Sequence, residues 1–286
     1  MAGTTGPVAR IRSALARDGF SQLAARLPRG YARFGSVVLL QLPEDLRTEF
    51  PRIGRAYALE LGADAVLRRS GPVEGEYRHP RVERIFGDRT ETEVLEHGVR
   101  YRFDAERIMF ARGNKTERAR AGRIVRAGEL VVDLFAGIGY FTLPAALSHS
   151  SVQVVAVETN PLSYRYLLEN IALNGVSGRV SAVLGDNRRV PLPWGEAHRV
   201  FLGYLPSSLP WIPLALRALR PAGGSLHVHL VVGSRGANEE ARHAVHDQLR
   251  TQGRTDARLT VRPVKPYGPG RTHCVVDVAW GTGVGG

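Results

Sequence analysis

The chain of 286 residues is strongly basic, because 39 Lys and Arg residues against 27 Asp and Glu give a formal net charge of +12 at pH 7. Its hydrophobic fraction of 43% is ordinary for a globular protein. No apolar run approaches the roughly 18 residues that cross a membrane, and Cys274, the only cysteine, excludes an internal disulfide and a cysteine-based metal cluster. We therefore expect a cytoplasmic protein without a membrane partner.

The positive charge is unevenly distributed along the chain. Residues 1–126 hold 24 basic and 16 acidic residues, so +8 of the +12 falls in under half of the length. Such an excess indicates a polyanionic partner, and nucleic acid is the commonest one. Only Lys115 and Lys265 among the cations are not Arg, a bias that the coding genome can also produce.

The first 110 residues alternate between short helices and strands. Helical spacing of apolar side chains predicts a helix over 8–27, interrupted near Gly19, and residues 28–30 predict a turn. The next predicted elements are a strand over 36–42, a helix over 43–61, a strand over 65–67, a loop over 71–80 and strands over 82–86, 92–95 and 99–104. We interpret 1–30 as a helical segment and 31–110 as a small α+β domain that binds RNA.

Residues 112–126 (RGNKTERARAGRIVR) contain six basic residues and one acid, Glu117. A helix is expected from about Thr116. It is interpreted as a phosphate-contacting linker helix beside the ligand-binding unit that follows it in the sequence. The alternative is a solvated connector helix.

A nucleotide-binding β-turn-α-β unit is predicted over 129–170. An apolar run ends in Asp133, a turn containing Gly137 and Gly139 follows, and a second β-rich run ends in Glu158. Glycines let the backbone approach a ligand closely, because they carry no Cβ. An acid at the end of the second strand can accept two hydrogen bonds from a ribose diol.

The turn of this unit reads D-x-F-A-G-x-G rather than G-x-G-x-x-G, so it offers no evident pyrophosphate cradle. Asp133 at its mouth would repel phosphate but would pair with a cationic amino group. A ligand with an adenosine end and an ammonium end fits both acids, and S-adenosylmethionine is such a ligand. We predict a Rossmann-like class I fold of S-adenosylmethionine-dependent methyltransferases over 111–286; a glycine-rich turn without a cofactor is the alternative.

Later strands add polar groups to the same edge. Asp186 and Asn187 follow a strand over 180–184 and are placed to meet an adenine amino group. A strand over 199–202 ends in a loop whose Tyr204 is expected to line the reacting cavity. The remaining predicted elements are a helix over 214–219 and strands over 225–232 and 274–280.

Two histidines, His227 and His229, share one face of the strand over 225–232. We interpret them as core histidines rather than metal ligands, since no third ligand has matching spacing. No metal is expected.

The loop after the strand over 199–202 begins with Gly203-Tyr204-Leu205-Pro206. Enzymes that methylate nitrogen often carry Asn/Asp-Pro-Pro-Tyr-like residues here, and their side-chain oxygen holds the nucleophile. Its absence argues against that version of amine methylation. Because the sulfonium of S-adenosylmethionine is already activated, positioning can supply much of the rate of an alkylation.

Several segments together resemble the wybutosine-synthesis protein 2 family, a sister of the tRNA guanine-37 N1-methyltransferases. They are MFARGNKTERAR (109–120), VVDLFAGIGYFTLPA (131–145), GDNRR (185–189), GYLPSS (203–208), GPVEGEYRHP (71–80) and VKPYGPGRTHCVVDV (264–278). The resemblance runs from about Phe34 to Trp280. It implies transfer of the 3-amino-3-carboxypropyl group of S-adenosylmethionine to a tricyclic guanine derivative at position 37 of phenylalanine tRNA. The anticodon loop would bind through an Arg-rich face.

The resemblance also implies roles for individual residues. Ala111 stands where the family usually has serine, and Arg118 replaces a lysine; both would touch the methionine end of the cofactor. The candidate cofactor contacts are Ala111, Arg118, Asp133, Phe135, Ala136, Gly137, Gly139, Phe141, Glu158, Asn160, Asp186 and Asn187. Arg78, Asn114 and Glu117 would face the target base. Glu117 is the candidate general base, with an ordinary first-turn acid as its alternative.

Other functions remain open from the sequence. A guanine N1-methyltransferase would use the same cofactor pocket, and so would an enzyme that modifies a small nucleotide-type substrate. The sister methyltransferases usually have Pro-Arg where this chain has Gly113 and an Asn-x-Pro loop at Gly203, which favours aminocarboxypropyl transfer. A non-catalytic RNA-binding relative would lack the acids Asp133, Glu158 and Asp186.

Overall fold

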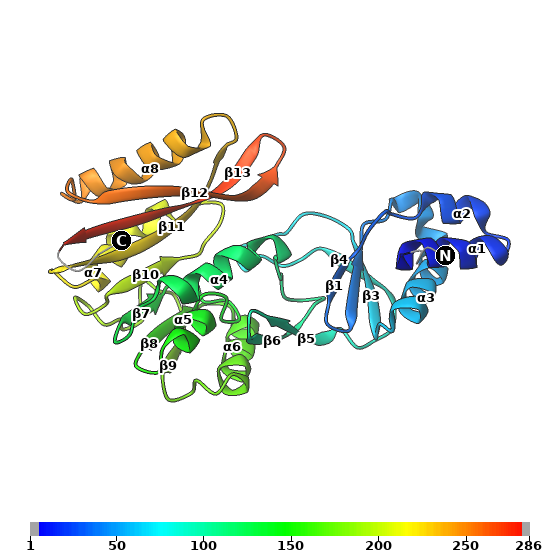
Figure 1. Cartoon of the computed structure of the whole chain (residues 1–286), viewed down its shortest axis with the longest axis horizontal. Coiled ribbons are helices and arrows are strands. Elements are labelled where there is room, and N and C mark those ends of the chain that lie inside the picture. Colours follow the sequence, from blue (N-terminus) through cyan, green and yellow to red (C-terminus); the bar gives the residue numbers. More distant parts are fainter. Residues whose placement is uncertain (1–5, 282–286) are drawn as a thin grey trace, which may run out of the picture. The chain divides into compact units, whose positions relative to one another are not determined.

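The computed structural model describes residues 6–281 of the chain. It divides into two compact units, Met1–Leu95 with Arg100–Phe110 and Glu96–Val99 with Ala111–Gly286 (Figure 1). The short segment Glu96–Val99 thus groups with the second unit, although its neighbours on both sides belong to the first.

The first unit has a four-stranded sheet of order β1-β2-β3-β4, in which β2 and β3 are parallel and the other pairs are antiparallel. Its elements are α1 (Pro7–Arg17), α2 (Ser21–Arg26), β1 (Ala32–Phe34), β2 (Val37–Leu40), η1 (Glu44–Glu49), α3 (Phe50–Leu61), β3 (Ala65–Arg69) and β4 (Val82–Phe86). The helix expected over 8–27 is two helices, which separate around Gly19, a residue with a φ of +90°. The strand β1 was not predicted.

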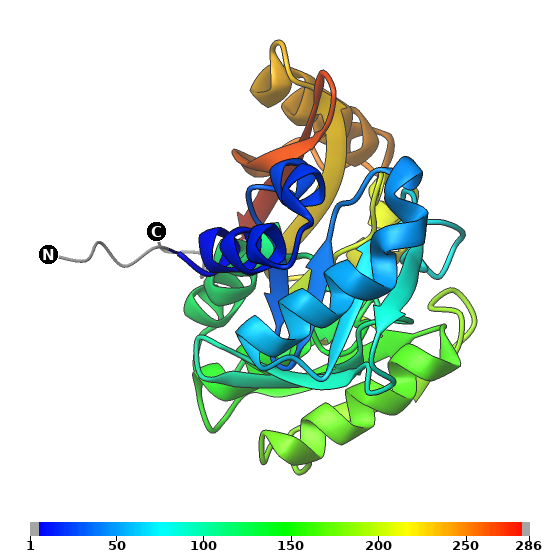
Figure 2. The same ribbon diagram turned by 90° about the vertical axis from the view of Figure 1, so that its right-hand side faces the viewer.

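The helices α1, α2 and α3 cover one face of this sheet and are drawn in blue tones in Figure 2. The apolar residues Phe50, Ile53 and Tyr57 lie at helical spacing on α3 and pack against Val38 and Val66 of the sheet. The apolar residues that recur at helical spacing in this part of the sequence are therefore the residues that form the core of the first unit.

A two-stranded sheet, β5 (Glu91–Glu96) with β6 (Val99–Asp104), follows the four-stranded sheet in the chain. Phe103 of β6 stacks on Phe110 with ring centroids 4.9 Å apart, and both rings lie edge-on to Phe34 of β1. This aromatic cluster joins the strand β6 to the sheet of the first unit.

The second unit is built on a seven-stranded sheet of order β12-β13-β11-β10-β7-β8-β9. Strands β7 to β11 are parallel, whereas β13 is antiparallel to both of its neighbours. The elements are η2 (Arg112–Asn114), α4 (Lys115–Ile124), β7 (Leu130–Asp133), α5 (Thr142–Ser148), β8 (Gln153–Glu158), α6 (Pro161–Leu173), β9 (Val180–Leu184), β10 (Arg199–Leu202), η3 (Leu209–Trp211), α7 (Ile212–Ala218), β11 (Gly223–Gly233), α8 (Ala237–Thr251), β12 (Arg258–Gly268) and β13 (Arg271–Gly281).

The strand order reverses at β7, which pairs with β8 on one side and with β10 on the other. In an open α/β sheet, ligands bind at such a reversal, outside the carboxyl ends of the strands. The predicted acids Asp133 and Glu158 end β7 and β8, so both lie at this edge.

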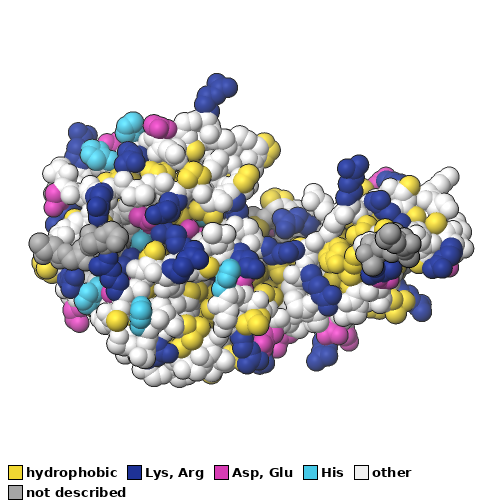
Figure 3. Space-filling model, in the orientation of Figure 1, with side chains coloured by type: hydrophobic (Ala, Val, Ile, Leu, Met, Phe, Trp, Pro, Cys, Tyr) yellow, Lys and Arg dark blue, Asp and Glu magenta, His cyan; other side chains and the backbone are white. Residues whose placement is uncertain are grey.

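Basic side chains are spread over the surface of both units in the view of Figure 3. On α4, however, the cations divide into two groups. Arg118 and Arg120 turn inward and pair with buried or half-buried acids, whereas Lys115 and Arg123 are exposed. Only part of the positive charge of this helix is therefore available to a partner.

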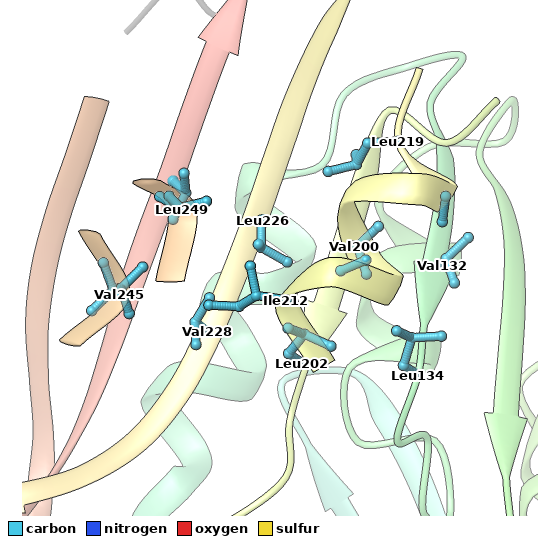
Figure 4. Packing of buried hydrophobic residues seen from close by; sticks show 14 of the residues in the cluster. Val132, Leu134, Val200, Leu202, Ile212, Leu219, Leu226, Val228, Val245 and Leu249 are labelled. Atoms are coloured by element: carbon cyan, nitrogen blue, oxygen red, sulfur yellow. The ribbon is translucent and has the colours of Figure 1, made fainter. Parts of the chain in front are cut away.

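One core of the second unit lies between the sheet and the helices α7 and α8 (Figure 4). Val132, Val200 and Val228 of adjacent strands point toward Ile212 of α7, and all four are fully buried. Because side chains alternate along a strand, neighbours such as Asp133 point to the opposite face. The helices α4 and α5 receive them there.

The helix α8 and the edge strand β12 were not predicted from the sequence. The helix α8 buries only Ala241, Val245 and Leu249 along one narrow stripe among polar residues. The edge strand β12 is largely exposed and contains Pro263 and Pro266. Neither carries the dense apolar pattern on which the other predictions depended. No helix within residues 6–281 is long and apolar enough to span a membrane.

The hydroxyl of Tyr57 gives a test of the first core. Tyr57 is fully buried, burial raises its pKa to about 12, and its hydroxyl makes no hydrogen bond within residues 6–281. Tyr57→Phe removes an unsatisfied polar group, so the free energy of unfolding should stay constant or rise by up to about 1 kcal/mol. Tyr57→Ala should lower it by about 3 to 5 kcal/mol, because a cavity remains. Urea unfolding measures both, and a loss above about 1.5 kcal/mol for Tyr57→Phe would contradict this packing.

Candidate functional site

Asp133 lies at the carboxyl end of β7 and is completely buried. Its carboxylate accepts hydrogen bonds from Thr142 Oγ1 at 2.8 Å and from the backbone N–H of Phe135 at 3.3 Å. Burial disfavours the charged form and raises the pKa of Asp133 to about 6, although these hydrogen bonds oppose the shift. A cation brought to this position would therefore be attracted, and it would favour the ionised acid.

The turn after β7 requires glycine at two positions. Gly137 and Gly139 have φ of +57° and +103°, which side-chain-bearing residues rarely adopt. A Cβ on Gly137 would lie 2.6 Å from the ring of Tyr140, and one on Gly139 would lie 2.7 Å from Leu143. Ala136, which is fully buried, donates its N–H to Val157 O of β8 at 2.9 Å. The turn thus packs against its surroundings without space for larger residues.

Glu158 holds this turn from the end of β8. Its Oε2 accepts the N–H of Gly137 at 2.7 Å, and its Oε1 accepts the N–H of Asn160 at 2.8 Å. Burial raises the pKa of Glu158, against the effect of these backbone donors. Asn160 in turn caps α6 by accepting the N–H of Leu162 at 3.0 Å. Each oxygen of Glu158 keeps a lone pair that suits one hydroxyl of a ribose diol.

Asp186 and Asn187 follow β9, as expected. Hydrogen bonds from Arg188 lower the pKa of Asp186 to about 2, so this acid is ionised. The Nδ2 of Asn187 donates to Leu134 O at 2.9 Å, while its Oδ1 is buried and makes no hydrogen bond within residues 6–281. Buried acceptors are normally satisfied. The position of Oδ1, beside the turn after β7, fits a hydrogen-bond donor of a bound ligand.

Ala111 and Arg118 are joined within the second unit. Arg118 donates from Nη1 to Ala111 O at 3.0 Å and forms a two-bonded pair with Glu96 at 3.0 and 2.8 Å. Both side chains of this ion pair are almost fully buried. Arg118 therefore orients the backbone of Ala111 while it neutralises Glu96.

Two acceptor groups lie at the start of α4, on its N-cap residue Asn114 and on Glu117 in its first turn. Asn114 Oδ1 is buried and makes no hydrogen bond within residues 6–281. Glu117, also buried, lies three residues further and thus on the same face of the helix. Its Oε1 accepts a hydrogen bond from Arg120 Nε at 2.8 Å. Two acceptors on one face suit a ligand with N–H groups along one edge.

The loop after β10 contributes Tyr204 to a group of three half-buried rings. Phe135 lies 5.2 Å from Tyr204 and 5.1 Å from Trp211, and Tyr204 and Trp211 are also 5.1 Å apart between ring centroids. Sequence analysis did not single out Trp211. The only available signal was an aromatic residue shortly after the strand that ends at this edge.

Gly203 is in contact with Phe141. A Cβ on Gly203 would lie 2.8 Å from the Phe141 ring, which itself stacks on Phe201 at 5.5 Å and lies 5.0 Å from His229. An asparagine or aspartate at position 203 would require this buried ring to move. The position where nitrogen methyltransferases carry an asparagine or aspartate is therefore closed to such a side chain by the Phe141 ring.

The two core histidines lie where the sequence predicted them, on one face of β11, a strand that is buried on both faces. His227 bonds Asp277 of β13, and His229 Nδ1 lies 3.0 Å from His273 Nε2. Within residues 6–281, no group of three or more His, Cys, Asp and Glu side chains is arranged to hold a metal ion. Asp277 was not singled out, because an isolated acid on an alternating strand is an ordinary surface pattern.

Arg78 belongs to the first unit. It lies in the loop over 71–80, where Glu74 and His79 form an isolated β-bridge. Its φ of +54° is in the left-handed region, and its N–H donates to Gly75 O at 3.1 Å. A left-handed arginine is uncommon and is typical of functional loops.

The sheet order, the reversal at β7 and the glycine turn held by Glu158 define the Rossmann-like fold of S-adenosylmethionine-dependent methyltransferases, as predicted. Residues 92–253 match the TRM5/TYW2 methyltransferase domain, and residues 11–90 match the TYW2 N-terminal domain. The chain belongs to the TRM5/TYW2 family and, within it, to the tRNA wybutosine-synthesizing protein 2 group.

Relatives in this group cover most of the chain. A Pyrococcus horikoshii protein named tRNA(Phe) (4-demethylwyosine(37)-C(7)) aminocarboxypropyltransferase is 36% identical over 277 residues, which make up 96% of this chain and 98% of that protein. The rat tRNA wybutosine-synthesizing protein 2 homolog is 36% identical over 255 residues, which make up 84% of this chain but 58% of the rat protein. The resemblance inferred from the motifs is thereby confirmed.

Two crystal structures show the same architecture. Pyrococcus horikoshii TYW2 in complex with MeSAdo matches with a TM-score of 0.84 and 33% identity, over 95% of this chain and 98% of that one. Methanocaldococcus jannaschii TYW2 in complex with AdoMet matches with a TM-score of 0.68 and 30% identity, over 87% of this chain and 98% of that one.

The raised pKa of Asp133 predicts a pH effect on stability. The pKa of Asp133 is about 6 in the folded state and near 3.8 in the unfolded state. The stability that the neutral acid contributes is therefore fully present below pH 4 and is lost as pH rises through 6. A shift of roughly 2 units corresponds to about 3 kcal/mol. Between pH 4 and pH 7, the free energy of unfolding of the Asp133→Asn protein should therefore rise by up to about 3 kcal/mol relative to that of the unchanged protein. Chemical denaturation across this range measures the difference, and parallel curves would refute the assignment.

Proposed function

We propose that the protein transfers the 3-amino-3-carboxypropyl group of S-adenosylmethionine to C7 of 4-demethylwyosine at position 37 of tRNA(Phe), and that it works in the cytoplasm. The likeness to a relative of that name over nearly its whole length supports this activity. The packing of Phe141 against Gly203 carries the choice of transferred group. It leaves no side-chain oxygen at the position where nitrogen methyltransferases hold their acceptor.

The pocket at the end of β7 and β8 has the chemistry that S-adenosylmethionine needs. Glu158 faces the ribose hydroxyls, and Asp186 with the unsatisfied Oδ1 of Asn187 faces the adenine. Asp133 stabilises the positive end of the co-substrate. Phe135, Ala136, Gly137, Gly139 and Phe141 form the wall along the methionine part, while Ala111 and Arg118 border its carboxylate and Asn160 fixes Glu158.

The reaction is a displacement at a carbon next to the sulfonium. C7 of the acceptor forms a bond to the γ-carbon of the methionine part, and the bond from this carbon to sulfur breaks. Sulfur keeps the electron pair and leaves as the thioether of 5′-methylthioadenosine. The proton on C7 passes to the free oxygen of Glu117, the general base. Asn114 orients the base through its polar edge, and Tyr204 lines the cavity. For Arg78, which belongs to the first unit, contact with the target base is proposed from the family resemblance alone.

The partner is the anticodon loop of tRNA, bound through exposed arginines. The net charge of +12 supports a polyanionic partner. On α4 the exposed cations Lys115 and Arg123 are available to phosphates, since Arg118 and Arg120 are paired with acids.

The released nucleoside tests the proposed activity. The assay uses labelled S-adenosylmethionine and tRNA. The tRNA should be isolated from cells that accumulate 4-demethylwyosine. We expect 5′-methylthioadenosine by chromatography, and Asp133→Ala should abolish it together with co-substrate binding. S-adenosylhomocysteine would instead establish a guanine N1-methyltransferase. Turnover on a free nucleotide alone would move the acceptor to a small molecule.

The salt dependence of tRNA binding tests the partner separately. An enzyme that neutralises about six phosphates should lose roughly a thousandfold in affinity for tRNA between 50 and 200 mM salt. Binding of S-adenosylmethionine alone, measured by calorimetry in the same buffers, serves as the control and should change little. A flat salt response for tRNA would argue against an electrostatic RNA interface.

A further inference from the structure

A network of hydrogen-bonded polar side chains leads from Glu117 on α4 into the sheet of the second unit. Arg120 donates to Glu117 Oε1 from both Nε and Nη2. The same guanidinium donates from Nη1 to Asp277 Oδ2 and from Nη2 to Asp277 Oδ1, both at 3.0 Å. Arg120 therefore bridges two carboxylates that lie 160 positions apart in the sequence.

Asp277 on β13 is the point where this network meets the sheet. Besides Arg120, it accepts hydrogen bonds from His227 Nδ1 at 2.6 Å and from Arg262 Nε at 2.9 Å. Burial acts against its charge, yet His227 and Arg120 hold the pKa of Asp277 well below its ordinary value. Asp277 is thus an anionic anchor with donors from α4, β11 and β12.

The hydrogen bonds of His227 have only one consistent direction. Arg199 Nη1, which can only donate, lies 2.8 Å from His227 Nε2. Nε2 therefore accepts, and Nδ1–H donates to Asp277. Burial lowers the pKa of His227 to about 4, in agreement with a neutral ring. Arg199 is itself held by Glu129 at 2.7 and 2.9 Å.

Hydrogen-bond donors and acceptors alternate along this network of side chains, from Glu129 to Glu117. Glu129 accepts from Arg199, Arg199 donates to His227, His227 donates to Asp277, and Asp277 and Glu117 both accept from Arg120. Every charge has an opposite neighbour, so the buried network is electrically balanced. Reversing any single link would place two donors or two acceptors face to face.

We propose that Asp277 is a positioning residue for Glu117, acting through Arg120. This inference rests on the function proposed above, in which Glu117 receives the proton of the acceptor base. Arg120 occupies Oε1 of Glu117, whereas Oε2 makes no side-chain hydrogen bond within residues 6–281. Asp277 fixes the guanidinium in one plane, and the plane fixes the direction of the free oxygen.

The geometry explains why an anchor outside α4 is needed. Glu117 and Arg120 are one helical turn apart on α4, so their ion pair alone ties each side chain only to its own helix. Both side chains would then be free to change rotamers together. A two-bonded contact to Asp277 removes this freedom. Misplacing a reacting group by about 1 Å can cost roughly a hundredfold in rate.

A double-mutant cycle with Glu117→Gln and Asp277→Asn tests the inference in the full-length protein. Asp277→Asn should lower kcat with S-adenosylmethionine and tRNA by roughly ten- to a hundredfold, while the Kd for S-adenosylmethionine stays within about threefold. In the Glu117→Gln background, the same substitution should lower kcat by less than about threefold, because its route of action is already lost. Effects that multiply would show that Asp277 acts on the fold alone, and would overturn the inference.

Two further variants complete the design. Asp247→Asn, at an exposed acid on α8, is the matched control and should leave kcat unchanged. If Asp277→Asn does not fold, Arg120→Lys replaces it, since lysine keeps the charge but cannot bridge both carboxylates. It should show the same loss and the same non-additivity.

A crystal structure of the Asp277→Asn protein separates this inference from the proposed function. The Glu117 carboxylate should turn away from its original rotamer, and an unchanged Glu117 would overturn the positioning role whatever the reaction is. If the unchanged protein forms no 5′-methylthioadenosine from any tRNA, the proposed function fails. In that case, the rotamer of Glu117 in the Asp277→Asn protein still tests the positioning role of Asp277 independently of the reaction.

Discussion

Glu158 is the residue on which the geometry of the second unit depends, because one carboxylate binds two turns together. Its two oxygens accept the N–H groups of Gly137 and Asn160, which belong to the turns after β7 and β8. The turn after β7 lies at the reversal of strand order, and ligands of open α/β sheets bind at such a reversal. Asn187 attaches the third turn by its hydrogen bond to Leu134 O. The segments that follow β7, β8 and β9 are thereby tied to one another by hydrogen bonds from two side chains.

Much of this edge could be predicted from the sequence, because each of its features is local. An apolar run that ends in an acid is visible at Asp133 and at Glu158, and parallel strands bring such ends together. The glycines of the turn are likewise visible, since glycine readily adopts the positive φ observed at Gly137 and Gly139, which other residues adopt rarely. The family motifs then added Asn114 and Glu117, whose roles no spacing rule provides, and these roles remain predictions.

The remaining parts depend on contacts between distant segments. Arg120 meets an acid 157 residues away, and His227 meets the same acid 50 residues away, so neither pairing leaves a periodic signal. The helix α8 and the edge strand β12 were missed because each has few buried residues to reveal it. The inward turn of Arg118 and Arg120 was hidden for a similar reason. A run of arginines looks like a solvated face until its acidic partners are placed.

The buried pair of Arg118 and Glu96 sets the smallest fragment that can keep the second unit intact. Glu96 precedes Ala111 in the chain by fifteen positions, yet it belongs to this unit and neutralises a guanidinium that is 3% exposed. A fragment that began at Ala111 would leave a buried charge without its carboxylate, at a cost of about 3 to 5 kcal/mol. The matched methyltransferase domain begins at residue 92, before Glu96. The natural border of the catalytic part therefore lies ahead of the β5–β6 hairpin turn, and any autonomous piece must carry that turn with it.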